Sequence, residues 1–162
     1  MKKYSIYTVI MVMLVLVQHF FVSRLVILHA SPDLLAVFIA FISMSVGQKT
    51  GTTYGFAAGL ISGLFTGNIG LSALVGTVEG FSAGYFHVPD ESHATWVKKR
   101  RMYYIAATTA LLLGNLLQAL LNDPLSLPLY VRLPEMVIIG TIMSMLLGTL
   151  MYNLVLKKLL KD

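Results

Sequence analysis

Residues 51–84 read GTTYGFAAGLISGLFTGNIGLSALVGTVEGFSAG, and this stretch decides the fold because its glycines are regularly spaced. They recur every four residues in two apolar segments, at Gly51, Gly55, Gly59, Gly63 and Gly67 in the first and at Gly76, Gly80 and Gly84 in the second. Four residues turn an α-helix through about 400°, so each set forms one smooth helix face. Such faces let two helix backbones approach closely within a membrane. The stretch therefore predicts two closely packed, membrane-embedded helices.

The glycine faces have two interpretations, and both are packing roles. In the first, which we favour, the two segments pack on each other or on the next apolar segment of the same chain. In the second, one glycine face receives a helix from a partner protein. The candidate packing or partner-binding residues are Gly55, Gly59, Gly63, Gly76, Gly80 and Gly84.

The composition of the 162-residue chain favours an integral membrane protein over a soluble one. Apolar residues make up 57% of the chain and charged residues 12%, whereas about a quarter of an ordinary soluble domain is charged. A soluble fold could not solvate such a surface. The absence of cysteine excludes disulfide bonds, thiolate metal ligands and cysteine nucleophiles.

Six apolar stretches are candidate membrane-spanning helices. They cover residues 4–22, 32–46, 52–66, 69–86, 102–121 and 134–156. A span needs about 20 apolar residues, and fewer where neighbouring helices shield it or the bilayer thins. The second and third stretches are short by this measure. The predicted fold class is all-α: one polytopic integral membrane domain over residues 1–162, with six transmembrane helices.

The positive charges predict how these spans are oriented. With a cytoplasmic amino terminus, ten lysines and arginines fall on the cytoplasmic side: Lys2, Lys3, Lys49, Lys98, Lys99, Arg100, Arg101, Lys157, Lys158 and Lys161. Only Arg24 and Arg132 fall outside. Positive residues concentrate on the cytoplasmic side of membrane proteins, so both termini are expected in the cytoplasm. Membrane topology thus explains the basic excess, and no nucleic-acid partner is expected.

Four polar side chains are predicted to lie within the spans. Glu79 is in the middle of the fourth span, where a carboxylate is costly and marks a candidate functional site. The alternatives are a neutral, merely hydrogen-bonded group and a side chain that reaches the interface through local thinning of the bilayer. Asn115 and Gln118 share a face of the fifth span, where amides usually join helices through hydrogen bonds. Asn153 lies near the end of the sixth span.

Two motifs that suggest catalysis or metal binding lack the context those functions need. Residues 80–84, GFSAG, match the G-x-S-x-G pattern, which requires a strand–turn–helix elbow and a histidine base. His87, Asp90, Glu91 and His93 crowd one loop, but their spacing matches neither HExxH nor its inverse. We therefore expect no catalytic residue, no metal and no cofactor, and the chain is not predicted to be an enzyme.

The end of that loop is predicted to anchor the protein at the membrane surface. Residues 96–101, WVKKRR, place one indole and four cations just before the fifth span. Tryptophan favours the headgroup region, and clustered cations attract anionic lipid.

Four segments occur in an order that is familiar from one family. They are Pro32-Asp33-Leu34-Leu35, Gly55-Phe56-Ala57-Ala58-Gly59-Leu60, Gly70-Leu71-Ser72-Ala73-Leu74 and Gly80-Phe81-Ser82-Ala83-Gly84-Tyr85. With Tyr152-Asn153 near the end, the chain resembles the rod shape-determining protein MreD family over nearly its whole length. Pro32 and Asp33 are the family-motif residues carried over. One position departs, because many relatives have an aspartate where this chain has Gly63.

The resemblance implies a non-enzymatic scaffold or regulator in a bacterial inner membrane, acting in the cell-elongation (Rod) complex that maintains rod shape. It implies MreC as a direct single-span partner, and MreB, RodA and a class B peptidoglycan transpeptidase as further members of the complex. It also implies a six-helix bundle similar to the substrate-binding S components of vitamin uptake transporters.

A small-molecule-binding membrane subunit of an uptake transporter is therefore the alternative function. Such a subunit needs polar and aromatic ligand contacts from its outer loops. The predicted outer loops are short and offer few of them, namely Gly67-Asn68, Asn122-Asp123, Tyr130 and Arg132. This scarcity favours the assembly role.

Overall fold

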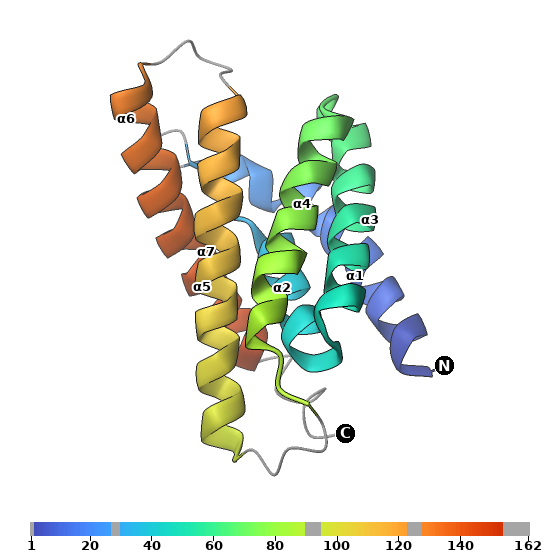
Figure 1. The fold of residues 1–162 in the computed structure, drawn as a ribbon. Helices are drawn as coiled ribbons and strands as arrows, with labels where there is room; N and C mark the ends of the chain where they lie inside the picture. Colours follow the sequence, from blue (N-terminus) through green and yellow to red (C-terminus); the bar gives the residue numbers. More distant parts are fainter. Residues whose placement is uncertain (1, 27–29, 90–94, 123–127, 154–162) are drawn as a thin grey trace.

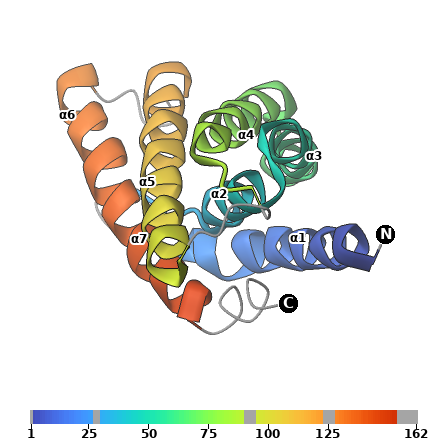
Figure 2. The same cartoon turned by 60° about the horizontal axis from the view of Figure 1, so that its bottom comes forward.

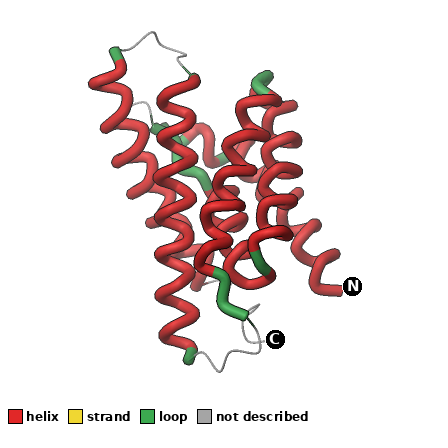
Figure 3. Tube along the Cα trace, viewed as in Figure 1, coloured by secondary structure: helices red, strands yellow, loops and turns green. Residues whose placement is uncertain are grey.

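The computed structural model describes all of the chain except residues 1, 27–29, 90–94, 123–127 and 154–162, and it leaves the side chains of residues 2 and 3 undescribed. The described residues form helices and connecting loops without a β-strand (Figure 3). The all-α prediction is confirmed for this part of the chain.

The helices follow one another through a bundle that is shown in Figure 1. In chain order they are α1 (Lys2–Phe20), α2 (Leu34–Val46), α3 (Gln48–Thr66), α4 (Ile69–Ala83), α5 (Trp96–Leu121), α6 (Leu129–Pro134) and α7 (Gly140–Met151). Short 3₁₀ turns at Val22–Arg24 and Gly84–Phe86 extend α1 and α4. Among the described residues, three continuous helical stretches are long and apolar enough to cross a membrane: Tyr4–Arg24, Trp96–Leu121 and Leu129–Met151.

Helix α2 is the centre of the bundle, between α1, the α3–α4 pair and α5 (Figure 2). Ten of its thirteen residues are buried. At 1.5 Å per residue it is about 20 Å long, which is shorter than the roughly 30 Å hydrocarbon core of a bilayer. Because neighbouring helices bury most of its side chains, α2 does not need the full length of a lipid-exposed span.

Aromatic side chains join α2 to α5 and to the end of α7. The rings of Tyr103 and Tyr152 stack with centroids 4.7 Å apart, and Phe41 meets the Tyr103 ring edge-on at 6.3 Å. All three side chains are almost completely buried. This cluster fixes the half of the bundle that is remote from the α3–α4 turn.

Helices α6 and α7 belong to one rod, at the left of Figure 1. A π-helical segment, Glu135–Ile139, joins them directly after Pro134. Proline has no N–H and its ring crowds the preceding turn, so it disrupts regular α-helical hydrogen bonding. The rod accommodates Pro134 by local widening rather than by a break.

Two predicted loop boundaries are wrong. The basic residues of 96–101 begin α5 instead of preceding the helix, since lysine and arginine are good helix formers whose long stems can lie along an apolar surface. Likewise, Leu129–Leu133 belong to α6 rather than to a loop. The predictions for Asp90, Glu91, His93 and the carboxy-terminal lysines lie outside the described residues.

Candidate functional site

The regularly spaced glycines form a seam between α3 and α4. Gly55 and Gly76 face each other so closely that a methyl group on either would overlap the carbonyl oxygen of the other. The remaining candidates make the same kind of contact: Gly59 against the backbone of Ser72 and Ala73, Gly63 against Ile69, Gly80 against Gly51, and Gly84 against Gln48. The structure thus uses all six candidate glycines for packing within the chain.

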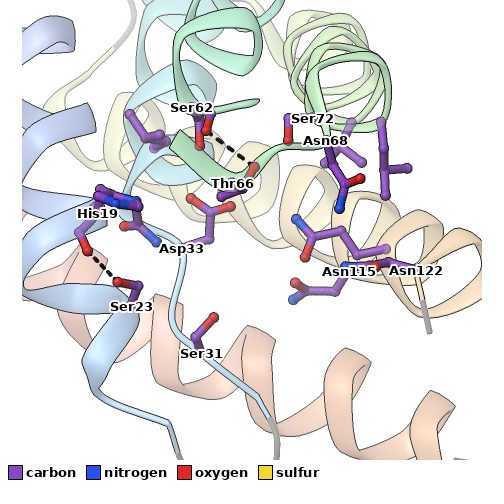
Figure 4. A pocket seen from close by; sticks show the side chains of 15 residues that line it. His19, Ser23, Ser31, Asp33, Ser62, Thr66, Asn68, Ser72, Asn115 and Asn122 are labelled. Carbon is purple, nitrogen blue, oxygen red and sulfur yellow. Dashed lines mark hydrogen bonds between the residues drawn. The ribbon is translucent and has the colours of Figure 1, made fainter. Parts of the chain in front are cut away.

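A polar cavity lies beyond this seam, at the end of the bundle that carries the α3–α4 turn. Its volume is about 190 Å³, and five helices or their ends contribute to it. All lining residues except Leu35, Leu71 and Val75 are polar: Gln18, His19, Ser23, Ser31, Asp33, Ser62, Thr66, Asn68, Ser72, Asn115, Gln118 and Asn122. Figure 4 shows Asp33 near the middle of this ring, between Ser62 and Thr66 on one side and Asn115 on another.

A smaller pocket of about 50 Å³ continues the cavity toward the middle of α4. The two spaces share the polar residues Asp33, Ser62, Ser72 and Gln118 and the apolar residues Leu35 and Val75. The small pocket adds Glu79, whose side chain is 3% exposed. The predicted intramembrane carboxylate therefore lies at the bottom of a polar passage.

Glu79 fits between α4 and α5 because α5 has a glycine opposite to it. A methyl group on Gly114 would overlap the Oε1 atom of Glu79. Glu79 makes no side-chain hydrogen bond to any residue that the structure describes. Asp33 lines the same small pocket, and like charges on two neighbouring carboxyl groups repel each other. Gly114 is not among the site residues predicted from the sequence. The one feature of the sequence that marks it is that it is the only glycine in α5.

Asp33 is held in place by α1 and α7. Its Oδ1 atom accepts the Ala36 N–H at 3.0 Å and so caps α2, and its own N–H donates to the Ser144 hydroxyl at 2.7 Å. Gln18 binds both neighbouring residues, donating to the Pro32 carbonyl at 2.8 Å and accepting the Leu34 N–H at 3.0 Å. The motif residues Pro32 and Asp33 thus connect three helices, and Gln18 and Ser144 are partners that sequence reasoning missed.

The other predicted polar residues divide between the cavity and the surface. Asn115 and Gln118 both line the cavity, and the Asn115 amide also donates to the Thr141 hydroxyl at 3.1 Å, which joins α5 to α7. Asn153 is exposed just beyond α7. Sequence reasoning placed ligand contacts in the loops at this end of the bundle. The structure instead lines the cavity mostly with residues of the helices.

The residues of the rejected chemical motifs have ordinary helical and capping contacts. The Ser82 hydroxyl donates to the Glu79 carbonyl at 3.1 Å within α4. The His87 Nδ1 atom lies 2.7 Å from the Met44 carbonyl oxygen. In the part of the chain that the structure describes, no three histidine, cysteine or acidic residues gather as a metal site would require.

Searches with known protein families, curated proteins and solved structures find no match to this chain. The arrangement itself offers two features with functional meaning. One is a rigid, glycine-packed helix pair, and the other is a polar cavity with two carboxylates.

Proposed function

We propose that the chain is a non-enzymatic scaffold or regulator in a bacterial inner membrane. In this proposal it is a six-span protein with both termini in the cytoplasm. It binds MreC directly and helps the elongation complex, with MreB, RodA and a class B transpeptidase, to position peptidoglycan synthesis and maintain rod shape. The basis is the resemblance of its sequence motifs to the MreD family.

The observation that carries the proposal is the convergence of those motifs into one packed unit. Pro32 and Asp33 lie immediately before α2, with Asp33 as its N-cap, and the other three motif segments lie in α3 and α4 or extend α4. Helices α2 and α4 are also bonded to each other, since the Ser43 hydroxyl of α2 donates to the Gly80 carbonyl of α4 at 2.9 Å. Residues used in this way build a rigid framework, which is what a scaffold requires.

The charge distribution supports the proposed orientation. Lys49 begins α3 and the basic residues 98–101 begin α5, at the end of the bundle opposite the α3–α4 turn. Arg24 follows α1 and Arg132 lies in α6, both at the turn end. An excess of lysine and arginine on one side is typical of the cytoplasmic face.

Two exposed surfaces are available to a partner helix. One is a groove over α3 and α4, lined by Gln48, Lys49, Thr52, Thr53, Phe56, Thr77 and Phe81. The other is an aliphatic stripe on the last rod, formed by Ile138, Ile142, Leu146 and Leu150. Interfaces between membrane helices favour small and hydroxyl-bearing residues, whereas large aliphatic side chains pack equally well against lipid. We therefore assign the MreC helix to the groove.

Site-specific crosslinking in native membranes tests this assignment. A photoreactive residue at Thr53 or Phe56 is expected to crosslink a single-span MreC-like protein, which mass spectrometry of the purified adduct identifies. The matched positions Ile142 and Leu146 are expected to give little of that adduct. Crosslinking only from the α7 positions would move the interface, and absence of the partner from all adducts and from mild-detergent purifications would contradict the scaffold proposal.

The polar cavity favours a second candidate, a small-molecule-binding membrane subunit of an uptake transporter. Ligand sites are typically concave and carry a few convergent polar groups, as here. Co-purification of ATPase subunits or of a tightly held vitamin would support this candidate over the scaffold.

A further inference from the structure

We propose that the polar cavity binds a small organic cation, whose ammonium group is neutralised by the carboxylates of Asp33 and Glu79. The inference does not depend on the assembly role, because the cavity lies away from the groove assigned to the partner helix.

The first step of the argument is the isolation of Glu79. Its side chain is 3% exposed and makes no hydrogen bond within the described chain. It lines the smaller pocket of about 50 Å³, here called the inner pocket. A buried carboxylate without a counter-charge is costly, and more so inside a membrane helix. The carboxylate occupies the space left by Gly114, which any larger side chain at this position of α5 would fill. No described residue supplies an opposite charge to the group in this pocket, which leaves that place to a ligand.

The second step is the sign of the missing charge. Asp33 and Glu79 both line the inner pocket, and neither space has a lysine or arginine in its lining. The basic side chain in the polar cavity of about 190 Å³, here called the outer cavity, is His19. Its ring packs against Phe65 with centroids 4.8 Å apart. Two acidic groups without an arginine or lysine beside them favour a positively charged ligand over a neutral or negative one.

The third step is the size and chemistry of that cation. The outer cavity of about 190 Å³ far exceeds the roughly 15 Å³ of such volume that one water needs, yet it is smaller than a drug-sized site. The hydroxyl groups of Ser62 and Ser72 and the amide of Gln118 line the same pocket as the two carboxylates. An ammonium group has three N–H donors and no acceptor, which suits such a set of oxygen acceptors.

Calorimetric titration of the purified full-length chain in detergent at neutral pH tests the proposal. The probes are ethanolamine and putrescine, with sodium, magnesium and calcium chloride as the inorganic arm. We expect saturable binding of at least one amine. Glu79→Gln keeps the shape of the side chain and should weaken that binding by about 30-fold or more, and Asp33→Asn, which retains helix-capping ability, by about tenfold. Glu135→Gln removes a carboxylate outside the cavity and should leave binding within about twofold of wild type.

Three results would overturn the proposal. Saturable binding of a metal cation but of neither amine would assign the site to an inorganic ion. Equal amine binding by wild type and Glu79→Gln would place the amine elsewhere. An absence of binding to both classes of probe would show that the carboxylates are satisfied by protons. None of these results would change the crosslinking expected at the α3–α4 groove, so failure of this inference is distinguishable from failure of the proposed function.

Discussion

The two sides of α4 differ in how they meet their neighbours. Toward α3 the helix presents glycines, and backbone lies directly against backbone without room for a single methyl group. Toward α2 and α5 it presents Glu79, Ser72 and Val75 to a polar space that the surrounding helices do not fill. The same fifteen-residue helix therefore forms both a direct backbone-to-backbone contact and the wall of the cavity.

The difference shows how the cavity can persist inside a small bundle. An unfilled polar space favours collapse of the helices around it unless their positions are fixed elsewhere. The α3–α4 seam supplies one fixed wall, and the bonds of Gln18 and Ser144 around Asp33 fix the start of α2. Changes to the seam should therefore have larger effects than changes to the cavity wall.

The largest effect is expected from filling the seam. In Gly59→Leu the new side chain would meet the backbone of Ser72 and Ala73, which cannot move aside as a flexible side chain can. We expect a loss of about 3 kcal/mol or more in the free energy of unfolding, measured by steric trapping in bicelles. Gly70→Leu is the matched control, because a Cβ atom there meets nothing within 4 Å. Equal destabilisation by both variants would show that the seam is not close-packed.

A smaller effect on the free energy of unfolding is expected at the cavity wall, and its sign should depend on whether Glu79 is present. Gly114→Ala places a methyl group against the Glu79 carboxylate, which can partly move away, so we expect a loss of about 1–2 kcal/mol. In a Glu79→Ala background the overlap disappears, and alanine is favoured over glycine within a helix by about 0.5–1 kcal/mol. The same substitution should then be neutral or stabilising.

A double-mutant cycle of unfolding free energies measures this coupling directly. We expect an interaction energy of about 1–2 kcal/mol between positions 79 and 114. Purely additive effects would mean that the Glu79 side chain does not occupy the space opposite Gly114.

The sequence predicts the seam better than the cavity. The seam residues are close together in the sequence, whereas the cavity residues come from distant parts of it. The glycines recur every four residues within two neighbouring helices, so their shared face follows from helix geometry alone. Apolar runs likewise locate the helices. The segment expected to be a loop up to Arg101 is helical from Trp96, because charge does not prevent a helix from continuing past a membrane boundary.

The cavity depends on residues that are close only after folding. Glu79 was recognised as unusual from its place in an apolar run, but its neighbour Gly114 lies on another helix and has no periodic partner. Asp33 was recognised through a family motif, whereas Gln18 and Ser144, which hold it, are ordinary polar residues in apolar helices. Pairings of this kind arise from helix packing, which no local pattern encodes.

The smallest effect is expected where α7 meets the start of α2. Ser144→Ala removes the acceptor of the Asp33 N–H, and a partly buried donor left without a partner costs about 1 kcal/mol. Thr149→Val is the matched control, since the Thr149 hydroxyl donates to the Met145 carbonyl within the same rod. We expect the serine variant, and not the threonine variant, to lower the unfolding free energy by this amount. Because Asp33 also lines the cavity, Ser144→Ala should weaken amine binding as well, by less than Asp33→Asn does. Equal stability of the two variants, with unchanged amine binding, would show that the hydrogen bond to Ser144 does not position Asp33.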